Sequence, residues 1–318
     1  MNAAVLHELG KPPRCEAFPD PVAGEGEVVV DVLAAALKPV DKQLASGAHY
    51  AAPQQLPMVC GTDGVGRLAD GQRVFFGGCR SPYGAMAQRT VVPKAFTFDV
   101  PDELDDAAAA ALPNPGVSAW LSLAYRAKLM PGDSVLILGA TGIAGRLAVK
   151  IAKILGAARV VAAGRNPEAL RSLLDQGADA TLRLDLPATE LRSAFAKAAG
   201  SSGFQAVIDF VWGEPAEQFF AATARKEFAV IGGDIRYVQV GESAGSKISL
   251  PAAVLRSAPI NILGTGGIPP YDILTQALRD VLAHAARGDL QVETETVPLT
   301  QIEQAWHFNY RRRLVVAP

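Results

Sequence analysis

Residues 135–145 read V-L-I-L-G-A-T-G-I-A-G. A short apolar run stops at Gly139, and Gly142 and Gly145 follow at equal intervals where a helix-like sequence begins. Between a strand and a helix, the first glycine permits a tight turn, the second lets a pyrophosphate approach the backbone, and the third lets the helix pack closely on the strand. The N–H groups at the start of the helix then face the anion. We therefore predict a dinucleotide site formed by Gly139, Ala140, Thr141, Gly142, Ile143, Ala144 and Gly145.

The stretch V-V-A-A-G-R-N at 160–166 predicts which dinucleotide is bound. An acidic side chain at the end of the second strand would accept hydrogen bonds from the adenosine ribose of NADH. Gly164 stands at that place instead, followed by Arg165 and Asn166. We expect the glycine to leave room for a 2′-phosphate and the guanidinium to pair with it bidentately, so the sequence favours NADPH. The alternative is that Arg165 is a solvated surface arginine.

Strands and helices alternate from about residue 116 onward. The strands are continuously apolar, as they must be in a parallel sheet that helices cover on both faces. This pattern predicts a doubly wound parallel sheet, the Rossmann arrangement, in an α/β chain. The expected strands are 135–138, 159–163, 180–184, 206–211, 228–232 and 260–263, and the expected helices are 143–155, 167–175, 188–199, 215–224 and 271–287.

Residues 1–115 have a different pattern, because they read as short strands separated by glycine-containing turns. A helix that opens with acidic residues, D-D-A-A-A-A-A-L at 105–112, ends this part of the chain. The length of 318 residues fits two domains. The expected strands are 28–33, 65–69, 73–76 and 88–93, with two more near 291–297 and 313–317.

Composition excludes several classes of function. A net charge of −2 gives no electrostatic reason to expect nucleic acid or an anionic membrane as a partner. Three cysteines without a C-x-x-C pair predict neither a disulfide framework nor a zinc knuckle. The N-terminus has no signal-peptide pattern and no apolar run is long enough to span a bilayer, so we expect a cytoplasmic enzyme.

Four further segments resemble one family. They are K-P-V-D-K-Q-L-A-S-G at 38–47, L-P-M-V-C-G-T-D-G-V-G at 56–66, A-A-A-L-P-N-P-G-V-S-A-W at 109–120, and R-G-D-L with V-P-L-T-Q-I-E-Q-A-W at 287–306. Together with a glycine turn in mid-chain, they resemble the medium-chain dehydrogenase/reductase superfamily, and most closely its zinc-independent quinone oxidoreductase branch. The resemblance implies a GroES-like catalytic domain over 1–115, a Rossmann domain over 116–257, and a last segment, 258–318, that adds a final sheet strand and returns to the catalytic domain.

Zinc members of that superfamily would have a cysteine near position 38, a His-Glu pair near 62–63 and a cysteine near 114. This chain has Lys38, Thr62, Asp63 and Asn114 at those places. A protonated lysine cannot ligate zinc, and asparagine and threonine are poor zinc ligands. We therefore expect no metal.

The resemblance also implies further cofactor contacts at the carboxyl ends of sheet strands. Gly232 and Gly233 stand at the end of the expected strand 228–232, and Gly264 and Thr265 follow the expected strand 260–263. We expect the second of these strands to lie at the sheet edge and to pair with a second copy in a homodimer.

A metal-free reductase needs a hydrogen-bond donor for the acceptor oxygen that gains negative charge. Lys38 either polarises that oxygen or pairs with Asp41 and is structural. Tyr50 stands near the tyrosine donor of related enoyl-thioester reductases, although His49 is an alternative. Asn114 contacts nicotinamide ribose or substrate, or is only a turn residue between two prolines.

These expectations converge on an NADPH-dependent, zinc-independent reductase that transfers hydride to a quinone or an α,β-unsaturated carbonyl. The first alternative is an enoyl-thioester reductase. An alternative of another class is an NADPH-binding redox sensor or structural protein with little turnover.

Overall fold

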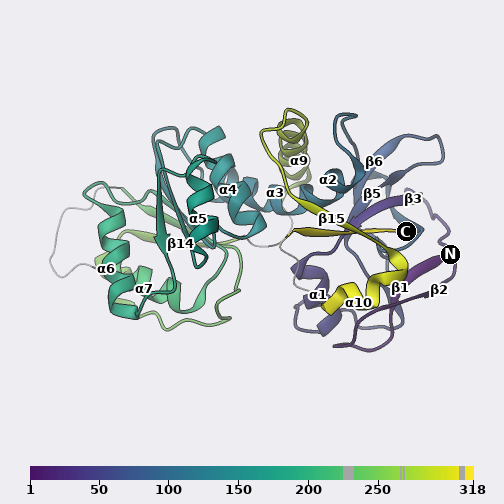
Figure 1. Ribbon diagram of the computed structural model, residues 1–318, viewed down its shortest axis with the longest axis horizontal. Helices are drawn as coiled ribbons and strands as arrows, with labels where there is room; N and C mark the ends of the chain where they lie inside the picture. The colour runs from purple at the N-terminus through teal and green to yellow at the C-terminus, as the bar shows by residue number, and fades with distance from the viewer. Residues whose placement is uncertain (225–232, 266, 268, 308–311) are drawn as a thin grey trace. The chain divides into compact units, whose positions relative to one another are not determined.

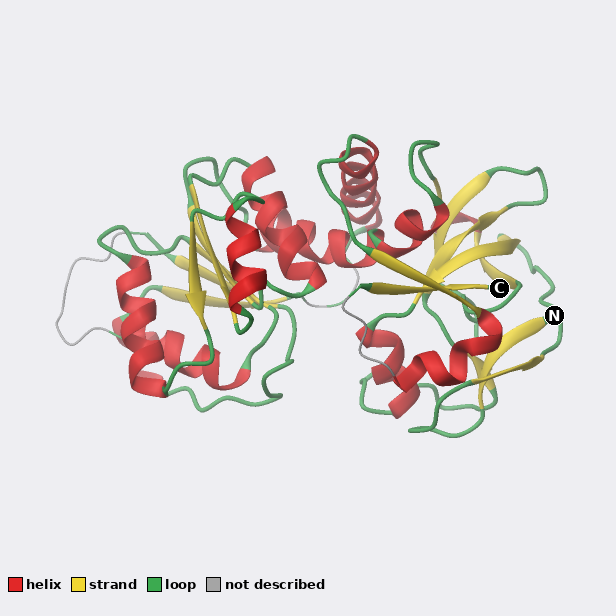
Figure 2. Ribbon diagram, viewed as in Figure 1, coloured by secondary structure: helices red, strands yellow, loops and turns green. Residues whose placement is uncertain are grey.

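The computed structural model describes all of the chain except residues 225–232, 266, 268 and 308–311. The chain is mixed α/β and divides into two compact units (Figures 1 and 2). The β-rich unit comprises Met1–Asn114 and Leu282–Pro318, and the parallel-sheet unit comprises Pro115–Val281. The expected last segment, 258–318, is thus shared between the two units. No described helix has the length and apolar character needed to cross a membrane.

The parallel-sheet unit contains a six-stranded sheet in the order β11-β10-β9-β12-β13-β14. All neighbouring strands are parallel. This is the strand order of a doubly wound dinucleotide-binding fold, so the predicted Rossmann architecture is confirmed. The strands are β9 (Ser134–Leu138), β10 (Arg159–Gly164), β11 (Ala180–Arg183), β12 (Ala206–Asp209), β13 (Ile235–Gln239) and β14 (Ile260–Gly264).

Helices cover both faces of this sheet. Helices α4 (Ile143–Ile154) and α5 (Pro167–Leu174) lie on one face, and α6 (Ala188–Ala199) and α7 (Gly213–Thr223) lie on the other (Figure 1). Apolar residues at helical spacing drive this packing, because Ala148, Ile151 and Ala152 of α4 are fully buried against the sheet. The unit also contains the π-type turn η2 (Leu121–Arg126) and α8 (Ala252–Ser257), together with most of α3 (Pro113–Trp120) and most of α9 (Tyr271–Ala286), two helices that run across the division between the units.

One strand of the sheet differs from the prediction. The expected strand 228–232 lies outside the described residues, and the place between β12 and β14 is taken by β13. The sequence analysis did not predict β13, because its sequence, I-R-Y-V-Q, contains polar residues and is not continuously apolar. Arg236 is accommodated because its guanidinium pairs with Asp133 at 2.6 Å and donates to two backbone carbonyls, while Tyr237 and Val238 are fully buried.

The β-rich unit contains a seven-stranded sheet and a three-stranded sheet. The first has the order β15-β16-β3-β5-β6-β8 with β7 also pairing β3, and the second has the order β2-β1-β4. The C-terminal strand β16 pairs antiparallel with β3, which ties the end of the chain to this unit. The strands are β1 (Asn2–Leu6), β2 (Arg14–Ala17), β3 (Glu27–Ala36), β4 (Met58–Val59), β5 (Asp63–Arg67), β6 (Arg73–Gly77), β7 (Arg89–Pro93), β8 (Thr97–Asp99), β15 (Thr294–Pro298) and β16 (Arg313–Ala317); the helices are α1 (Pro39–Ser46), α2 (Asp106–Ala111) and α10 (Ile302–His307), with short 3₁₀ turns η1 (Lys94–Phe96) and η3 (Leu299–Gln301).

Candidate functional site

The glycine turn joins the central strand β9 to α4. Gly139 has φ +83°, a left-handed conformation that favours glycine. The N–H groups of Gly139 and Ala140 both donate to the carbonyl of Ala163 on β10, at 2.9 Å. Gly142 is the N-cap of α4 and its N–H donates to the carbonyl of Gly139 at 3.1 Å. The backbone of the turn is therefore fixed by hydrogen bonds to β10 and by one within the turn.

The three glycines are not equivalent. A Cβ on Gly145 would lie 2.3 Å from the carbonyl oxygen of Gly139 and 2.6 Å from the Cα of Ala140, so close packing requires this glycine. A Cβ on Gly142 would meet only the carbonyl oxygen of Gly139, at 3.4 Å, and Gly142 is exposed. The turn thus leaves open backbone where the first N–H groups of α4 lack intrahelical partners, which fits a pyrophosphate.

The loop after β12 closes one side of this turn. A Cβ on Gly139 would lie 2.8 Å from Cγ1 of Val211 and 3.2 Å from Cβ of Phe210. Ligands of open α/β sheets bind at the point where the strand order reverses, here between β9 and β12. The glycine turn therefore occupies the expected ligand position of the fold.

Asp209 holds that loop in place. Its side chain is fully buried, and Oδ1 accepts the N–H groups of Val211 and Trp212 at 2.7 and 2.9 Å. The Tyr237 hydroxyl donates to Oδ2. Burial raises the pKa of Asp209 and raises the pKa of Tyr237 well above its usual value. With its acceptors used by the protein, Asp209 supports the loop rather than a ligand.

The second predicted cofactor stretch is only partly as expected. A Cβ on Gly164 would lie 2.6 Å from Cγ2 of Thr141, so the space beside this glycine is filled by the glycine turn itself. Asn166 is the N-cap of α5, where its Oδ1 accepts two backbone N–H groups at 3.0 Å. Arg165 is exposed. Arg165 and Asn166 are both exposed, but the side chain of Asn166 is engaged in the helix cap, so Arg165 is the residue of the three that could reach a phosphate.

The structure adds two arginines that the sequence analysis missed. Arg183 ends β11, in register with Gly164 of β10, and forms a bidentate pair with Asp185 at 2.9 and 2.6 Å. Arg183, with a smaller contribution from Arg165, lowers the pKa of Asp185. Arg146 of α4 donates from Nε to a carbonyl of the glycine turn at 3.1 Å. The sequence alone does not show that Arg183 lies beside Gly164, because the two residues are on different strands and only the pairing of β10 with β11 brings them together.

One predicted pair of glycine contacts stays a prediction. Gly232 lies outside the described residues, and Gly233 precedes β13. Gly233 therefore lies toward the amino end of β13, away from the edge where parallel strands present ligands. The carboxyl end of β13 is followed by Gly241, where a Cβ would lie 2.7 Å from the carbonyl oxygen of Phe210.

The other predicted pair lies where expected. Gly264 is the last residue of β14 and is exposed, and Thr265 follows it. The carbonyl oxygen of Thr265 accepts from Nε and Nη2 of Arg126 at 3.2 and 2.7 Å. The backbone after β14 is thus anchored to the helical segment that follows α3.

In the β-rich unit, Lys38 lies at the centre of a polar cluster whose charged members are buried. The cluster has five members, Lys38, Asp41, Thr62, Asp63 and Asn114, and we call it the Lys38 cluster. The lysine is only 1% exposed. Its Nζ donates to the carbonyl oxygen of Ala36 at 2.9 Å and to Oδ1 of Asp63 at 3.0 Å, and lies 3.3 Å from Oδ2 of Asp41.

Helix capping places the first two members. Pro39 begins α1, and Asp41 in its first turn accepts the backbone N–H of Lys38 through Oδ2 at 2.8 Å. Burial lowers the pKa of Lys38, but the charges of Asp41 and Asp63 outweigh it and raise that pKa overall. Burial raises the pKa of Asp41.

The remaining members connect the two carboxylates. The backbone N–H of Thr62 donates to Oδ1 of Asp41 at 3.1 Å, and its hydroxyl lies 3.2 Å from that atom and 3.1 Å from Oδ2 of Asp63. Nδ2 of Asn114 lies 3.5 Å from the same Asp63 oxygen. Asn114 is exposed, whereas the lysine and both carboxylates are buried.

The structure brings together two of the three predicted catalytic residues, Lys38 and Asn114. It favours the structural alternative for Lys38, because protein acceptors surround the ammonium and exclude an outside oxygen. Tyr50 is 92% exposed and stacks on His49 with ring centroids 4.2 Å apart. Among the described residues, the interaction recorded for the Tyr50 side chain is this ring contact, and none with the Lys38 cluster is recorded.

The Lys38 cluster does not fit zinc. It offers oxygen donors only, and a permanent cation already lies between its two carboxylates. Within the described part of the chain, no group of three or more His, Cys, Asp and Glu side chains is placed to hold a metal.

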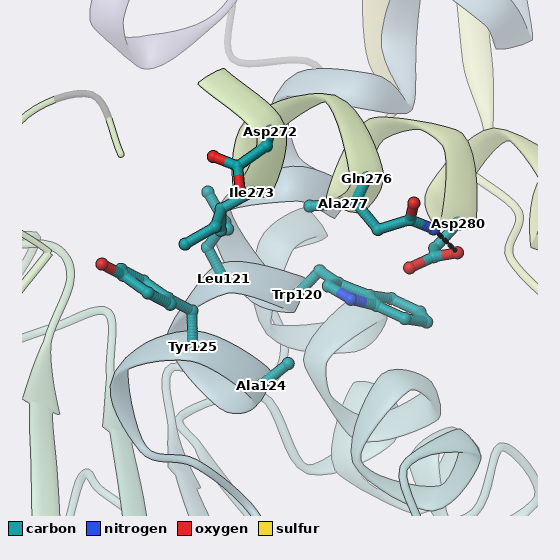
Figure 3. A pocket seen from close by; sticks show the side chains of 9 residues that line it. All are labelled: Trp120, Leu121, Ala124, Tyr125, Asp272, Ile273, Gln276, Ala277 and Asp280. Atoms are coloured by element: carbon teal, nitrogen blue, oxygen red, sulfur yellow. Dashed lines mark hydrogen bonds between the residues drawn. The ribbon is translucent and has the colours of Figure 1, made fainter. Parts of the chain in front are cut away.

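A separate pocket of about 470 Å³ lies in the parallel-sheet unit between α9 and the segment around η2 (Figure 3). Asp272 and Asp280 line it beside apolar and aromatic side chains. It is a poor fit for a dinucleotide, because carboxylates repel phosphates and the pocket includes no residue of the glycine turn. The lining residues are Trp120, Leu121, Ala124, Tyr125, Asp272, Ile273, Gln276, Ala277 and Asp280.

Comparison with known proteins gives consistent similarities. Residues 144–271 match the family model described as zinc-binding dehydrogenase. A probable NADPH-dependent quinone reductase of Emericella nidulans is 30% identical over 230 residues, which are 68% of this chain and 63% of that protein. The quinone oxidoreductase-like protein 2 of Bos taurus is 27% identical, over 98% of this chain and 90% of that protein.

A solved structure extends the similarity to the whole chain. The quinone oxidoreductase of Thermus thermophilus, whose structures include a complex with NADPH, has a TM-score of 0.82 and 29% identity, with 100% of both chains covered.

Proposed function

The chain belongs to the medium-chain dehydrogenase/reductase superfamily as a quinone oxidoreductase-like member, and we propose that it is an NADPH-dependent reductase of quinones or α,β-unsaturated carbonyls that works without a metal ion. The observation that carries this proposal is the glycine turn. Its middle glycine is open to solvent, its third glycine is required by packing, and Arg146 adds positive charge beside it. When bound there, NADPH supplies the hydride.

The preference for NADPH is proposed from two arginines at the carboxyl ends of neighbouring strands. Arg165 follows β10, and Arg183 ends β11. Guanidinium groups recognise phosphate through paired hydrogen bonds. The last residue of β10, where an acidic side chain would bind the ribose of NADH, is Gly164. The side chain of Arg165 is the principal selector, since Arg183 is already paired with Asp185.

The acceptor oxygen gains negative charge during reduction and needs a hydrogen-bond donor. We propose Asn114 for this role, because its amide is the exposed polar group of the Lys38 cluster. Asp63 positions that amide, and Lys38 holds Asp63 through its ammonium. Tyr50 remains a second candidate donor, since its hydroxyl side chain is open to solvent.

The test measures NADPH consumption by the purified chain with a naphthoquinone, an enone and crotonyl-CoA. We expect turnover with the first two. Turnover with crotonyl-CoA alone would assign the chain to the enoyl-thioester reductases. Tight NADPH binding without turnover on any acceptor would support the redox-sensor alternative. Asn114→Ala, compared with Tyr50→Phe, shows which residue serves the acceptor, because only loss of the true donor lowers kcat.

We also propose a homodimer formed through β14. Among the described strands, β14 is the last of its sheet, and its residue Ile262 is 38% exposed. An exposed apolar edge strand offers unpaired backbone groups to a second copy. Light scattering of the wild type should give a dimer and Ile262→Lys a monomer; a monomeric wild type at micromolar concentration contradicts the proposal.

A further inference from the structure

The Lys38 cluster has the form of a cation site whose cation is supplied by the chain. Three oxygens surround the Lys38 ammonium: the carbonyl of Ala36 and one carboxylate oxygen each from Asp41 and Asp63, at 2.9 to 3.3 Å. These oxygens come from the end of β3, from α1 and from β5. They are fixed by backbone hydrogen bonds and by Thr62, so the ligand shell does not depend on the lysine alone.

The charges of this region balance only when the ammonium is present. Asp41 and Asp63 are both buried, and Arg313 of β16 is the second buried cation nearby. Burial lowers the pKa of Arg313, while the charges of Asp41 and Asp63 raise it. Arg313 is held elsewhere by a hydrogen bond from Nη1 to the carbonyl of Leu37 at 2.9 Å. Removing the ammonium would leave two buried carboxylates against one cation, which is costly in a low dielectric.

We infer that the Lys38 ammonium is a built-in replacement for a metal ion, and that the same oxygens bind a divalent cation when Lys38 is replaced by a small neutral residue. Carboxylate and carbonyl oxygens are the ligands that hard cations such as Mn²⁺ and Ca²⁺ prefer. Replacing Lys38 by alanine removes most of its side chain and leaves a cavity between the two carboxylates. The ion binds in that cavity. In the wild type the ammonium excludes the ion by charge and by volume.

This inference concerns the β-rich unit, outside residues 144–271, which match the zinc-binding dehydrogenase model. It does not depend on the proposed cofactor or acceptor, because it concerns ion binding and stability alone. A competing explanation is protonation: without the ammonium, Asp41 takes up a proton and no ion is needed. Burial already raises the pKa of Asp41, so this alternative has a physical basis.

The test compares Lys38→Ala with the wild type and with Lys42→Ala, a control that removes a partly buried lysine from the same helix. Melting temperatures are measured with and without Mn²⁺, with Ca²⁺ as a second probe and choline chloride as the ionic-strength control. Bound manganese is then measured after gel filtration. The double variant Lys38→Ala/Asp63→Asn removes one carboxylate ligand.

We expect Lys38→Ala alone to melt roughly 10 °C below the wild type. Mn²⁺ well above its dissociation constant should raise that melting temperature by roughly 5 °C or more, with a single manganese ion retained per chain. The wild type, Lys42→Ala and the double variant should show no such rise.

Two results would overturn the inference. One is a folded Lys38→Ala variant that neither cation stabilises, which favours protonation of Asp41. The other is an equal response of the wild type. If Lys38→Ala does not fold alone, refolding with Mn²⁺ should restore its far-ultraviolet circular dichroism, and failure to do so with either cation also contradicts the inference.

Discussion

The glycine turn and the Lys38 cluster solve the problem of holding charge in opposite ways. The turn is a short continuous segment, built from backbone, in which missing side chains leave N–H groups for a ligand's phosphates. The Lys38 cluster is assembled from distant segments, and side chains fill it so completely that its cation is 1% exposed. The turn is therefore shaped to receive a charged ligand, whereas the cluster carries its own counter-charge and receives none.

Loss of the internal cation should have the largest effect on stability. Breaking a buried ion pair costs about 3–5 kcal/mol, so we expect Lys38→Met to lower the free energy of unfolding by about that amount. The pKa of Lys38 is raised above its usual 10.5 in the folded chain. Its contribution is therefore complete below pH 10.5 and declines as the pH rises through the folded value.

Urea unfolding of the wild type and Lys38→Met from neutral pH to above this range measures the effect. The gap between the two proteins should shrink only at the alkaline end. A constant gap into strongly alkaline solution, or no gap at neutral pH, shows that the ammonium does not stabilise the cluster.

Two substitutions separate the packing role of the glycine turn from its role in NADPH binding. Gly145→Ala puts a methyl group 2.3 Å from the carbonyl oxygen of Gly139, so we expect a loss of about 1–3 kcal/mol in stability together with loss of NADPH binding. Gly142→Ala meets no atom closer than 3.4 Å and should leave the melting temperature unchanged while weakening NADPH binding. Calorimetric titration and thermal unfolding separate the two. Normal NADPH affinity in Gly142→Ala places the pyrophosphate somewhere else.

The two regions also differ in how far the sequence predicts them. The turn follows from consecutive residues, since strand, glycines and helix stand next to one another, and backbone conformation depends on local sequence. Lys38 could not be assigned a role, because its closest carboxylate, Asp63, is 25 residues away and only the fold brings them together. The surroundings of Gly164 were hidden for a similar reason, because Thr141, which fills the space beside this glycine, lies in the glycine turn and not in the same strand.

The sheet illustrates the same limit. Apolar strands were predicted within a few residues, but β13 was missed, because Arg236 interrupts its apolar pattern. Its partner Asp133 precedes β9 and is 103 residues away in sequence. Long-range pairs of this kind decide which polar residues a core strand tolerates, and one sequence read alone does not show them.

A smaller effect is expected for cofactor choice. Arg165→Ala removes a charge-assisted contact worth about 1.5–3 kcal/mol, so NADPH should bind about 10- to 100-fold more weakly. NADH affinity should change little, because it lacks the 2′-phosphate. Competition titrations with both cofactors measure the ratio, with Arg171→Ala on α5 as the control for losing an exposed arginine. Parallel losses for NADH and NADPH would mean that Arg165 does not read the phosphate.

The smallest effect on stability is expected for a partly exposed ion pair at the surface. Lys153 and Asp179 in the parallel-sheet unit are 2.6 Å apart with side chains 31% and 42% exposed. Exposed pairs of this kind contribute about 0.5 kcal/mol, and salt screens them. Lys153→Ala should therefore shift the urea midpoint far less than Lys38→Met does. Similar shifts for the two variants would remove the distinction between a buried cation and a surface one.

Metal-free turnover tests the central claim most directly. The purified chain is dialysed against a chelator, its metal content is measured, and NADPH consumption is followed with a naphthoquinone. The account predicts an unchanged rate in protein that contains no zinc. Loss of activity on chelation with recovery on adding Zn²⁺ would contradict it.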